Sequence, residues 1–275
     1  MSDLHLEFGA LDRPIPHGDV LILAGDITLI GVLDKGDELH HRHPELHART
    51  VAFFTEAAKN FRRVFYLMGN HEAYSYNISK APRVIRHRLP MVEFLDDRSV
   101  HLSDDVVLVG GTLWTDMNMG KAHDFIGGKF GNARMNDFNL IWKSSKGGTE
   151  KFTTYDAAKR FRKTIRVIEE VAETYRDKTV VVATHHAPSY RGINPEHGGG
   201  VLDAGYASDL EAFIKTRHAI KHWIHGHTHI QAEYEIGHCT VHSNGRGYYQ
   251  RERSAATFNP DTSFEVAAER AEAAA

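Results

Sequence analysis

The sequence contains a single cysteine, Cys239, among its 275 residues. One cysteine excludes a framework of disulfide bonds and a zinc site built on thiolates. The chain also lacks an apolar run long enough to span a bilayer, and we find no signal peptide. We therefore expect a cytoplasmic protein with no membrane partner.

An excess of charge of one sign is absent too, because the formal net charge is only -3. Such a balance provides no general attraction to nucleic acid or to an anionic membrane. With 41% hydrophobic residues, a chain of this length can bury a full core. Histidine, in contrast, is abundant: 20 histidines stand against three tryptophans, which favours metal chemistry.

Three of these histidines lie within five positions, in the stretch Ile224-His225-Gly226-His227-Thr228-His229. The stretch follows an apolar run at 219–224 that predicts a buried strand. On an extended segment, side chains two apart share a face, so His227 and His229 can converge on one point. Neutral imidazoles at the end of a strand suit a metal such as Zn, Mn or Fe. A lone histidine would more often be solvated or hydrogen-bonded, so further ligands must come from elsewhere in the chain.

The same pattern of an apolar strand followed by polar side chains recurs along the chain. The runs at 19–24 and 64–68 lead into Gly25-Asp26 and Gly69-Asn70-His71-Glu72, and the run at 179–184 leads into His185 and His186. Helical spacing of apolar residues between the strands predicts crossover helices. Because α/β folds place their sites at the carboxyl ends of strands, the sequence predicts an α/β fold with a site at these ends.

Between 115 and 154 the periodicity fades, and glycines, lysines and arginines alternate with aromatic residues. Long irregular stretches inside a compact domain are usually functional or disordered. We interpret this stretch as a lid-like insertion in a single domain of residues 1–265, with a plain solvated loop as the alternative. The Ala/Glu-rich stretch 266–275 is predicted to be a disordered tail.

Five short motifs, in order and each at a predicted strand end, resemble the signature of the calcineurin-like metallophosphoesterases. They are Asp3-x-His5, Gly25-Asp26, Gly69-Asn70-His71-Glu72, His185 and Gly226-His227-x-His229. The Thr-His-His-Ala-Pro block at 184–188 and the Asn-x-Arg-Gly-Tyr block at 244–248 are similar to a bacterial and phage branch of uncharacterised phosphoesterases. The resemblance implies an α/β/β/α sandwich of two mixed sheets flanked by helices.

The resemblance also implies a set of ligands for two divalent metal ions. One ion would be held by Asp3, His5, Asp26 and His229, and the other by Asp26, Asn70, His185 and His227. Asp26 would bridge, since a carboxylate has two oxygens and can serve two cations at once.

Other residues receive roles outside the ligand set. His71 would stabilise the transition state or protonate the leaving oxygen. His185 aligns with the histidine of the family, so His186 would support the ligands or face the substrate. Arg134 and Arg246 are further candidates for substrate contacts.

By this resemblance the protein would be a dinuclear metal-dependent phosphoesterase that hydrolyses a phosphomonoester or a phosphodiester with metal-activated water. Mn, Fe and Zn all suit the ligand set, and manganese is one of these candidates. Basic residues among aromatics at 115–154 suggest a small nucleotide-like substrate. A nuclease acting on DNA or RNA is the alternative within the enzyme class, although a basic groove would then be expected. A non-catalytic binding scaffold of the same fold is the alternative from another class.

The start of the chain departs from the family pattern, because only Met1 and Ser2 precede Asp3. Relatives place an apolar strand there, so the N-terminal strand looks truncated and the run at 19–24 would lack a partner. We expect either a translation start upstream of Met1 or a fold in which the metal itself mainly holds Asp3 and His5. The first ion should then bind more weakly than the second.

Overall fold

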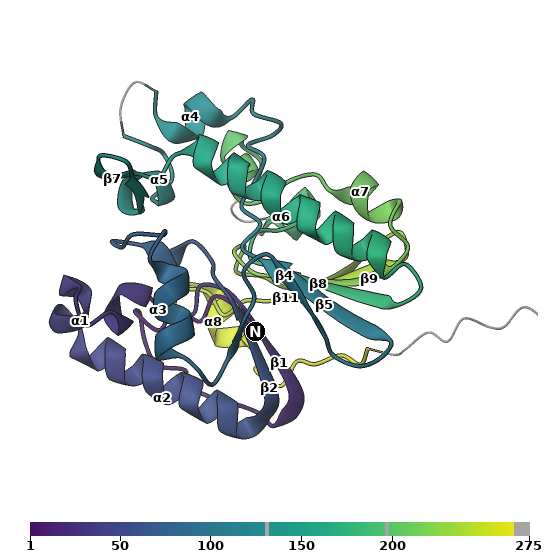
Figure 1. The fold of residues 1–275 in the computed structure, drawn as a ribbon, viewed down its shortest axis with the longest axis horizontal. Helices are drawn as coiled ribbons and strands as arrows, with labels where there is room; N and C mark the ends of the chain where they lie inside the picture. The colour runs from purple at the N-terminus through teal and green to yellow at the C-terminus, as the bar shows by residue number, and fades with distance from the viewer. Residues whose placement is uncertain (130–131, 196–197, 267–275) are drawn as a thin grey trace, which may run out of the picture.

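The computed structural model describes residues 1–129, 132–195 and 198–266. In this part of the chain, two β-sheets pack face to face and helices cover both outer faces (Figure 1). This arrangement confirms the predicted α/β fold of two sheets flanked by helices. The predicted tail lies, apart from Val266, outside the described residues.

The two sheets differ in size and in strand direction. The smaller sheet is entirely parallel, in the order β1 (Gly18–Ala24), β2 (Phe61–Leu67) and β3 (Glu93–Phe94). The larger sheet is mixed, in the order β10 (Gln231–Ile236), β11 (Cys239–Asn244), β9 (Ile220–His225), β8 (Thr179–Thr184), β5 (Val106–Gly111) and β4 (Arg98–His101). Its four inner strands are parallel, and its two edge strands are antiparallel to their neighbours.

The apolar runs of the strands fill three separate layers of core. In β8, Val180 and Val182 face the outer helices, whereas Val181 and Ala183 face the other sheet. Alternation of side chains along a strand places neighbours on opposite faces, and here both faces are covered. This is why the central strands read as continuous apolar runs in the sequence.

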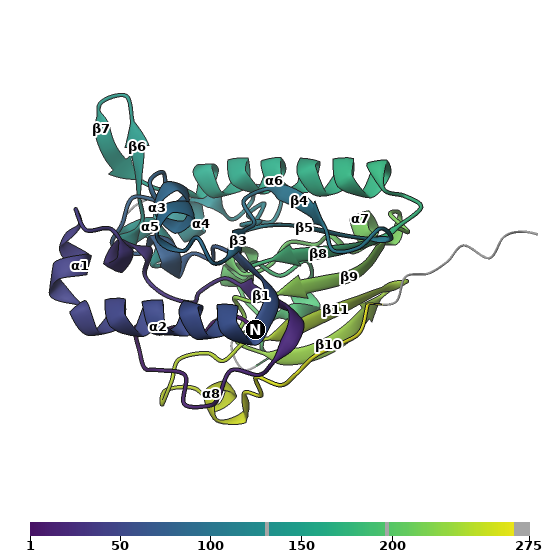
Figure 2. The ribbon, with the colours of Figure 1, turned by 60° about the horizontal axis from the view of Figure 1, so that its bottom comes forward.

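Helices cover the outer face of each sheet (Figure 2). The smaller sheet packs against α2 (Pro44–Asn60) and α3 (Ala81–Arg88), and the larger one against α6 (Thr154–Thr174) and α7 (Glu211–Lys215). Two short helices, α1 (Glu38–Arg42) and α8 (Arg253–Thr257), and 3₁₀ turns at 30–33, 71–73, 190–192 and 201–205 lie outside these packed pairs. Within the described residues, we find no helix with the length and apolar character needed to cross a membrane.

The segment 115–154 contains regular structure in its described part. It forms α4 (His123–Gly127), α5 (Asp137–Leu140) and a hairpin of β6 (Trp142–Ser145) and β7 (Gly148–Lys151). Ile126, Phe138 and Phe152 are buried in the core that also contains the small sheet. These contacts argue against a plain solvated loop.

The start of the chain lies between the two sheets. The backbone N–H of Asp3 donates to the carbonyl of Gly25 at 3.0 Å, and the N–H of Gly247 donates to the carbonyl of Asp3, also at 3.0 Å. Residues 1–6 make further bonds of this kind, so β1 has backbone partners on this side. The expectation that the metal mainly holds Asp3 and His5 is therefore corrected: backbone hydrogen bonds on both sides hold this segment.

Candidate metal centre

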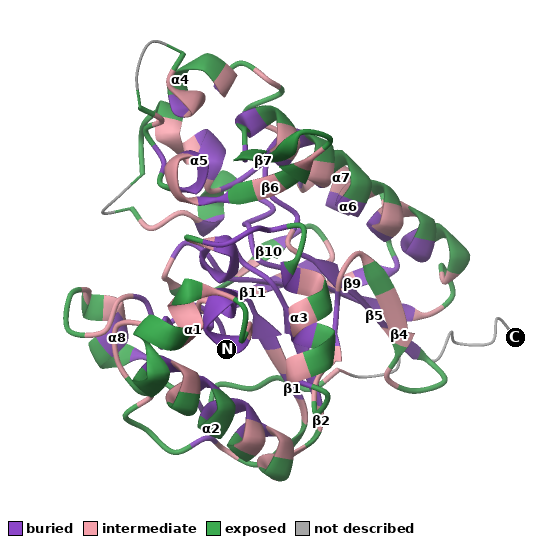
Figure 3. Cartoon of the chain, turned by 60° about the vertical axis from the view of Figure 1, so that its left-hand side comes forward, coloured by how far each residue is buried: buried purple, intermediate pink, exposed green. Residues whose placement is uncertain are grey.

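Polar side chains from four strand ends gather in the middle of the molecule. Each of four candidate ligands follows a strand by at most three residues: Asp26 follows β1, Asn70 follows β2, His185 follows β8 and His227 follows β9. All four are buried, and Figure 3 shows the surrounding strand ends as buried. The structure thus brings these four predicted residues together at the carboxyl ends of the strands.

The backbone at this site adopts an unusual conformation. Five residues have positive φ angles between 44° and 69°, namely Asp3, His5, Asp26, His227 and His229. Residues with a Cβ rarely adopt this left-handed conformation, and it persists where the surrounding structure imposes it. His227 and His229 therefore do not lie on an extended segment, and the prediction that they converge on one point is wrong.

The first cluster consists of Asp3, His5 and His229, whose ligand atoms all lie within 4.8 Å of one another. The Nε2 atoms of the two histidines are 3.0 Å apart. Their Nδ1 atoms each contact a carboxylate: Glu7 is 3.1 Å from His5, and Glu252 is 2.6 Å from His229. Because carboxylates only accept hydrogen bonds, both Nδ1 atoms carry the protons, and in the neutral rings both Nε2 lone pairs face each other. A cation between the two rings would satisfy both lone pairs.

The second cluster consists of Asp26, His185 and His227, again within 4.8 Å. Nδ1 of His185 donates to the carbonyl of Ala24 at 2.8 Å, so Nε2 is the free acceptor in the neutral ring. Yet Nε2 lies 3.3 Å from Asp26 Oδ2 and 2.9 Å from Asn70 Oδ1, which are also acceptors. Nε2 of His227 is buried without a hydrogen-bond partner in the described chain. Unpaired acceptors that converge in a buried space fit a metal ion.

Asp26 lies between the two clusters. Its Oδ2 is 3.8 Å from His5 Nε2 in the first cluster, and its Oδ1 accepts the backbone N–H of His71 at 2.8 Å. Burial raises the pKa of Asp26, but the His185 and His71 rings outweigh burial and hold it well below its usual range. A Cβ at Gly69 would overlap Asp26 Oδ1, which explains the glycine at this position.

His71 belongs to neither of these clusters, but it forms a third group with His5 and Glu7, whose ligand atoms also lie within 4.8 Å of one another. Its Nδ1 is 3.0 Å from Glu7 Oε1, and its Nε2 is 3.3 Å from the Tyr248 hydroxyl. Its ring stacks on Tyr74 with centroids 4.0 Å apart. Burial lowers the pKa of His71, but the carboxylates of Asp26 and Glu7 outweigh burial and raise it to about 9. His71 thus lies beside the site, with its Nδ1 bonded to the carboxylate of Glu7 and its Nε2 in contact with the Tyr248 hydroxyl.

Glu72 holds the loop that carries Asp26. Its carboxylate accepts the backbone N–H groups of Asp26, Ile27 and Gly69 at 2.9, 2.8 and 2.7 Å. These three hydrogen bonds to one carboxylate stabilise the left-handed backbone conformation at Asp26. Glu72 stands in the Gly-Asn-His-Glu motif, but the sequence analysis assigned it no role.

Three other carboxylates that contact the site also went unpredicted. Glu7 and Glu252 bond the outer nitrogens of His5 and His229, and Asp137 bonds the side-chain amide of Asn70. Glu7 has a weak signal, because it follows the Asp-x-His motif at an alternating position. Asp137 and Glu252 have no signal in the sequence, since each is far along the chain from the residue it contacts.

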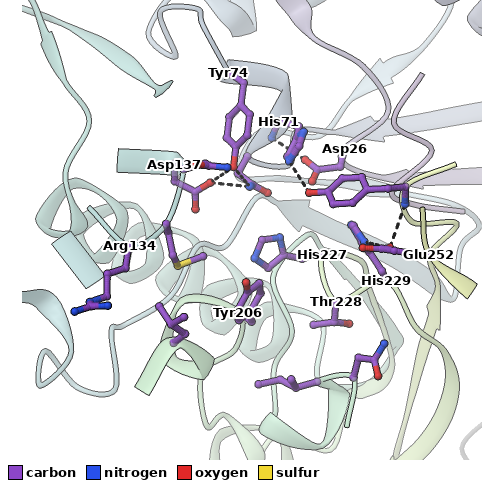
Figure 4. Close-up of a pocket in the computed structure, with 17 residues that line it drawn as sticks. Asp26, His71, Tyr74, Arg134, Asp137, Tyr206, His227, Thr228, His229 and Glu252 are labelled. Atoms are coloured by element: carbon purple, nitrogen blue, oxygen red, sulfur yellow. Dashed lines mark hydrogen bonds and ion pairs between the residues drawn. The ribbon is translucent and has the colours of Figure 1, made fainter. Parts of the chain in front are cut away.

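A cavity of about 340 Å³ opens onto the two clusters (Figure 4). Asp26, His71, His227 and His229 line its inner end, and residues 134–137 of the segment 115–154 line another side. Arg134 thus reaches the cavity, where its guanidinium also lies 4.6 Å from the Phe125 ring centroid.

The other two candidates for substrate contacts lie elsewhere. His186 is buried, packs 4.2 Å from the His227 ring and is not among the residues lining the cavity. Arg246 is fully buried, and its guanidinium donates to the carbonyls of Leu4, Gly9 and Ala10 at 3.1, 3.3 and 2.8 Å. This geometry contradicts the expected substrate contact of Arg246, because its two terminal nitrogens fasten the start of the chain.

A buried site of histidines and carboxylates at the strand ends of two packed sheets is typical of metal-dependent hydrolases. Residues 1–231 match the family model of the calcineurin-like phosphoesterases. The chain belongs to this family, as its motifs predicted, and is a metal-dependent phosphoester hydrolase.

Two further proteins are similar to this chain. The uncharacterized protein L509 of Acanthamoeba polyphaga mimivirus is 24% identical over 226 residues, which cover 76% of this chain and 75% of that protein. The crystal structure of phosphopantetheinyl hydrolase (PptH) from Mycobacterium tuberculosis superposes with a TM-score of 0.64, at 16% identity and with 92% of each chain covered. At this level of identity, the second similarity supports the fold alone.

Proposed function

We propose that the protein is a dinuclear phosphoesterase whose two ions share Asp26. The observation that carries this proposal is the pair of clusters in which unpaired acceptor atoms face one another on either side of Asp26. One ion would be held by Asp3, His5, Asp26 and His229, and the other by Asp26, Asn70, His185 and His227. The completeness of both sets favours an enzyme over a non-catalytic scaffold.

The donor atoms are nitrogen and oxygen without thiolate, which suits Mn, Fe or Zn. When bound, two such ions polarise the phosphoryl group and lower the pKa of a shared water. The chain itself would supply His71, which lines the cavity and contacts Tyr248 through Nε2. From there it would donate a hydrogen bond to the phosphoryl group or a proton to the leaving oxygen.

The substrate we propose is a small phosphate ester with an attached ring, such as a nucleotide. The cavity beyond the clusters has an apolar and aromatic wall with one cationic side chain, formed by Arg134, Met135, Ile193, Leu202 and Tyr206. Such a wall suits a ring, and the guanidinium suits a second anionic group. In this proposal the segment 115–154 acts as a lid-like insertion in a single domain of residues 1–265.

A nuclease remains the second candidate, supported only by the basic residues of the insertion. The net charge of -3 does not favour a nucleic-acid partner. A phosphopantetheinyl ester belongs among the assayed substrates because of the M. tuberculosis neighbour, although that similarity does not select it. Manganese as the metal and a cytoplasmic location stay predictions.

The test is a hydrolysis assay on metal-free protein reloaded separately with Mn²⁺, Fe²⁺ and Zn²⁺. Chromogenic monoesters and diesters, nucleotides, a phosphopantetheinyl ester and single-stranded DNA and RNA form the substrate panel. We expect hydrolysis of a small ester, with two ions bound per chain by elemental analysis. Two bound ions without hydrolysis of any member would support the scaffold, and preferential cleavage of nucleic acid would support the nuclease.

A further inference from the structure

The side chain of Asn70 poses a problem of orientation. Its amide oxygen can bind a cation, whereas its amide nitrogen carries two hydrogens and cannot. Oδ1 lies 2.9 Å from His185 Nε2, on the side of the second cluster. Something must keep the amide from turning round and presenting its nitrogen to the ion.

Asp137 lies on the other side of this amide. Its Oδ1 is 2.8 Å from Asn70 Nδ2, and Asp137 itself is only 2% exposed. A carboxylate accepts hydrogen bonds and offers none, so it binds the amide nitrogen and would repel the amide oxygen. The contact therefore selects the orientation in which the oxygen of Asn70 faces the cluster.

Tyr74 strengthens this arrangement. Its hydroxyl donates to the same Oδ1 of Asp137 at 2.7 Å and accepts from Asn70 Nδ2 at 3.2 Å. Its ring stacks on His71. The three side chains thus form a closed set of hydrogen bonds beside both a ligand candidate and the candidate proton donor.

Asp137 reaches this position from a distant part of the chain. It is the first residue of α5, and the next residue, Phe138, is buried in the core. Bridges between Tyr74 and Ile141 and between Asn77 and Trp142 fasten the same segment to the loop after β2. The place of Asp137 is therefore set by packing of the segment 115–154 and does not depend on Asn70.

We infer that Asp137 is a positioning residue, which fixes the amide of Asn70 so that its oxygen points at the second metal site. The inference rests on the proposed function and extends it. The segment 115–154 then does more than cover the cavity, because it supplies part of the support of the metal centre. Outer partners of metal ligands typically contribute 10- to 100-fold in metal affinity.

Three single variants test this role. Asp137→Leu keeps the approximate shape but removes the acceptor, Asp137→Asn keeps an acceptor oxygen without the charge, and Asp124→Leu changes an exposed carboxylate of the same segment as a control. Metal binding is followed by titration of the metal-free protein with Co²⁺. We expect Asp137→Leu to weaken one of two binding steps about 10- to 100-fold. The other step and the control should stay close to wild type. Asp137→Asn should lie between wild type and Asp137→Leu, because its amide can accept from Asn70 Nδ2 but can also donate to Asn70 Oδ1.

A double variant shows whether Asp137 acts through Asn70. Asn70→Ala combined with Asp137→Leu should bind Co²⁺ no more weakly than Asn70→Ala alone, because the partner is already gone. Additive losses, wild-type binding in Asp137→Leu, or equal loss of both ions would each overturn the inference.

A measurement without metal separates this inference from the proposed function. In metal-free protein, the side-chain amide signals of Asn70 in an NMR spectrum should shift in Asp137→Leu and not in Asp124→Leu. Unchanged signals in Asp137→Leu would refute the positioning role, even if the wild type binds two ions. If the wild type binds fewer than two ions, the dinuclear proposal is refuted. The NMR comparison still tests whether Asp137 orients Asn70, because it is made without metal.

Discussion

The two clusters of candidate ligands are built from different parts of the molecule. The second cluster, with Asn70 beside it, lies at the ends of β1, β2, β8 and β9, and the side chains of His185 and Asp26 are 0% and 2% exposed. The first cluster depends on residues 1–6 and on His229, whose side chain is 12% exposed. Strand ends in a packed core are held by many contacts, whereas a partly exposed side chain such as that of His229 is held by fewer. We therefore still expect the first ion to bind more weakly than the second.

The two clusters also differ in the groups that hydrogen-bond to their histidines. Histidines of the first cluster are held by the carboxylates Glu7 and Glu252, while His185 in the second is held by the backbone carbonyl of Ala24. A carbonyl in the core cannot be removed by substitution, but a carboxylate can. The first cluster is accordingly the easier of the two to perturb selectively.

The largest effect is expected for Asp26→Asn, which should weaken metal binding at both clusters, so that their affinities no longer differ. The substitution removes a negative charge from both sites at once, so we expect loss of most bound metal and loss of measurable hydrolysis. Elemental analysis of the purified variant is the measurement. Retention of two ions per chain would contradict the bridging role.

His71→Ala should affect turnover and leave both clusters filled. Because His71 lies outside both sets, we expect an unchanged metal content and a loss of roughly 10²- to 10⁴-fold in kcat, as for a general acid. The loss should be larger for an alkyl ester than for a chromogenic ester, since the poorer leaving group needs the proton more. Loss of metal in this variant would instead make His71 a ligand.

Glu252→Gln should weaken metal binding at the first cluster and leave metal binding at the second cluster unchanged. Glu252 contacts Nδ1 of His229 and lies outside the second cluster, so we expect about 10- to 100-fold weaker binding of the first ion alone. Stepwise Co²⁺ titration measures both steps in one experiment. If both steps weaken equally, the two clusters do not bind independently and the contrast between them fails.

Arg134→Gln is expected to have the smallest effect, because Arg134 belongs to neither cluster. An exposed charge contact contributes under about 1 kcal/mol, so KM for a nucleotide should rise about two- to fivefold. KM for a small chromogenic ester should hardly change. Lys121→Gln, an exposed residue of the same segment, is the control. Equal changes for both substrates would leave Arg134 without a role in specificity.

Much of the site could be predicted because its residues follow recognisable strands. Asp26, Asn70 and His185 each come after an apolar run. Asp26 and Asn70 follow neighbouring parallel strands of the smaller sheet, which end near one another, and His185 follows a strand of the larger sheet. The prediction was wrong for the geometry of His227 and His229, since extended backbone was assumed where both φ angles are positive. It was also wrong for Arg246, because a sequence does not show that three carbonyls of another loop surround its guanidinium.

By itself, the sequence determined the fold class, the family and the candidate ligands of the two clusters. These follow from local patterns: alternation within strands, helical spacing, and short motifs whose order along the chain is specific. Only the tertiary structure decided which carboxylates support the ligand candidates and that the backbone at His227 and His229 is left-handed. Glu252 lies 23 residues from His229, and Asp137 lies 67 residues from Asn70. Contacts at such separations depend on how whole elements pack, and no local pattern in the chain encodes them.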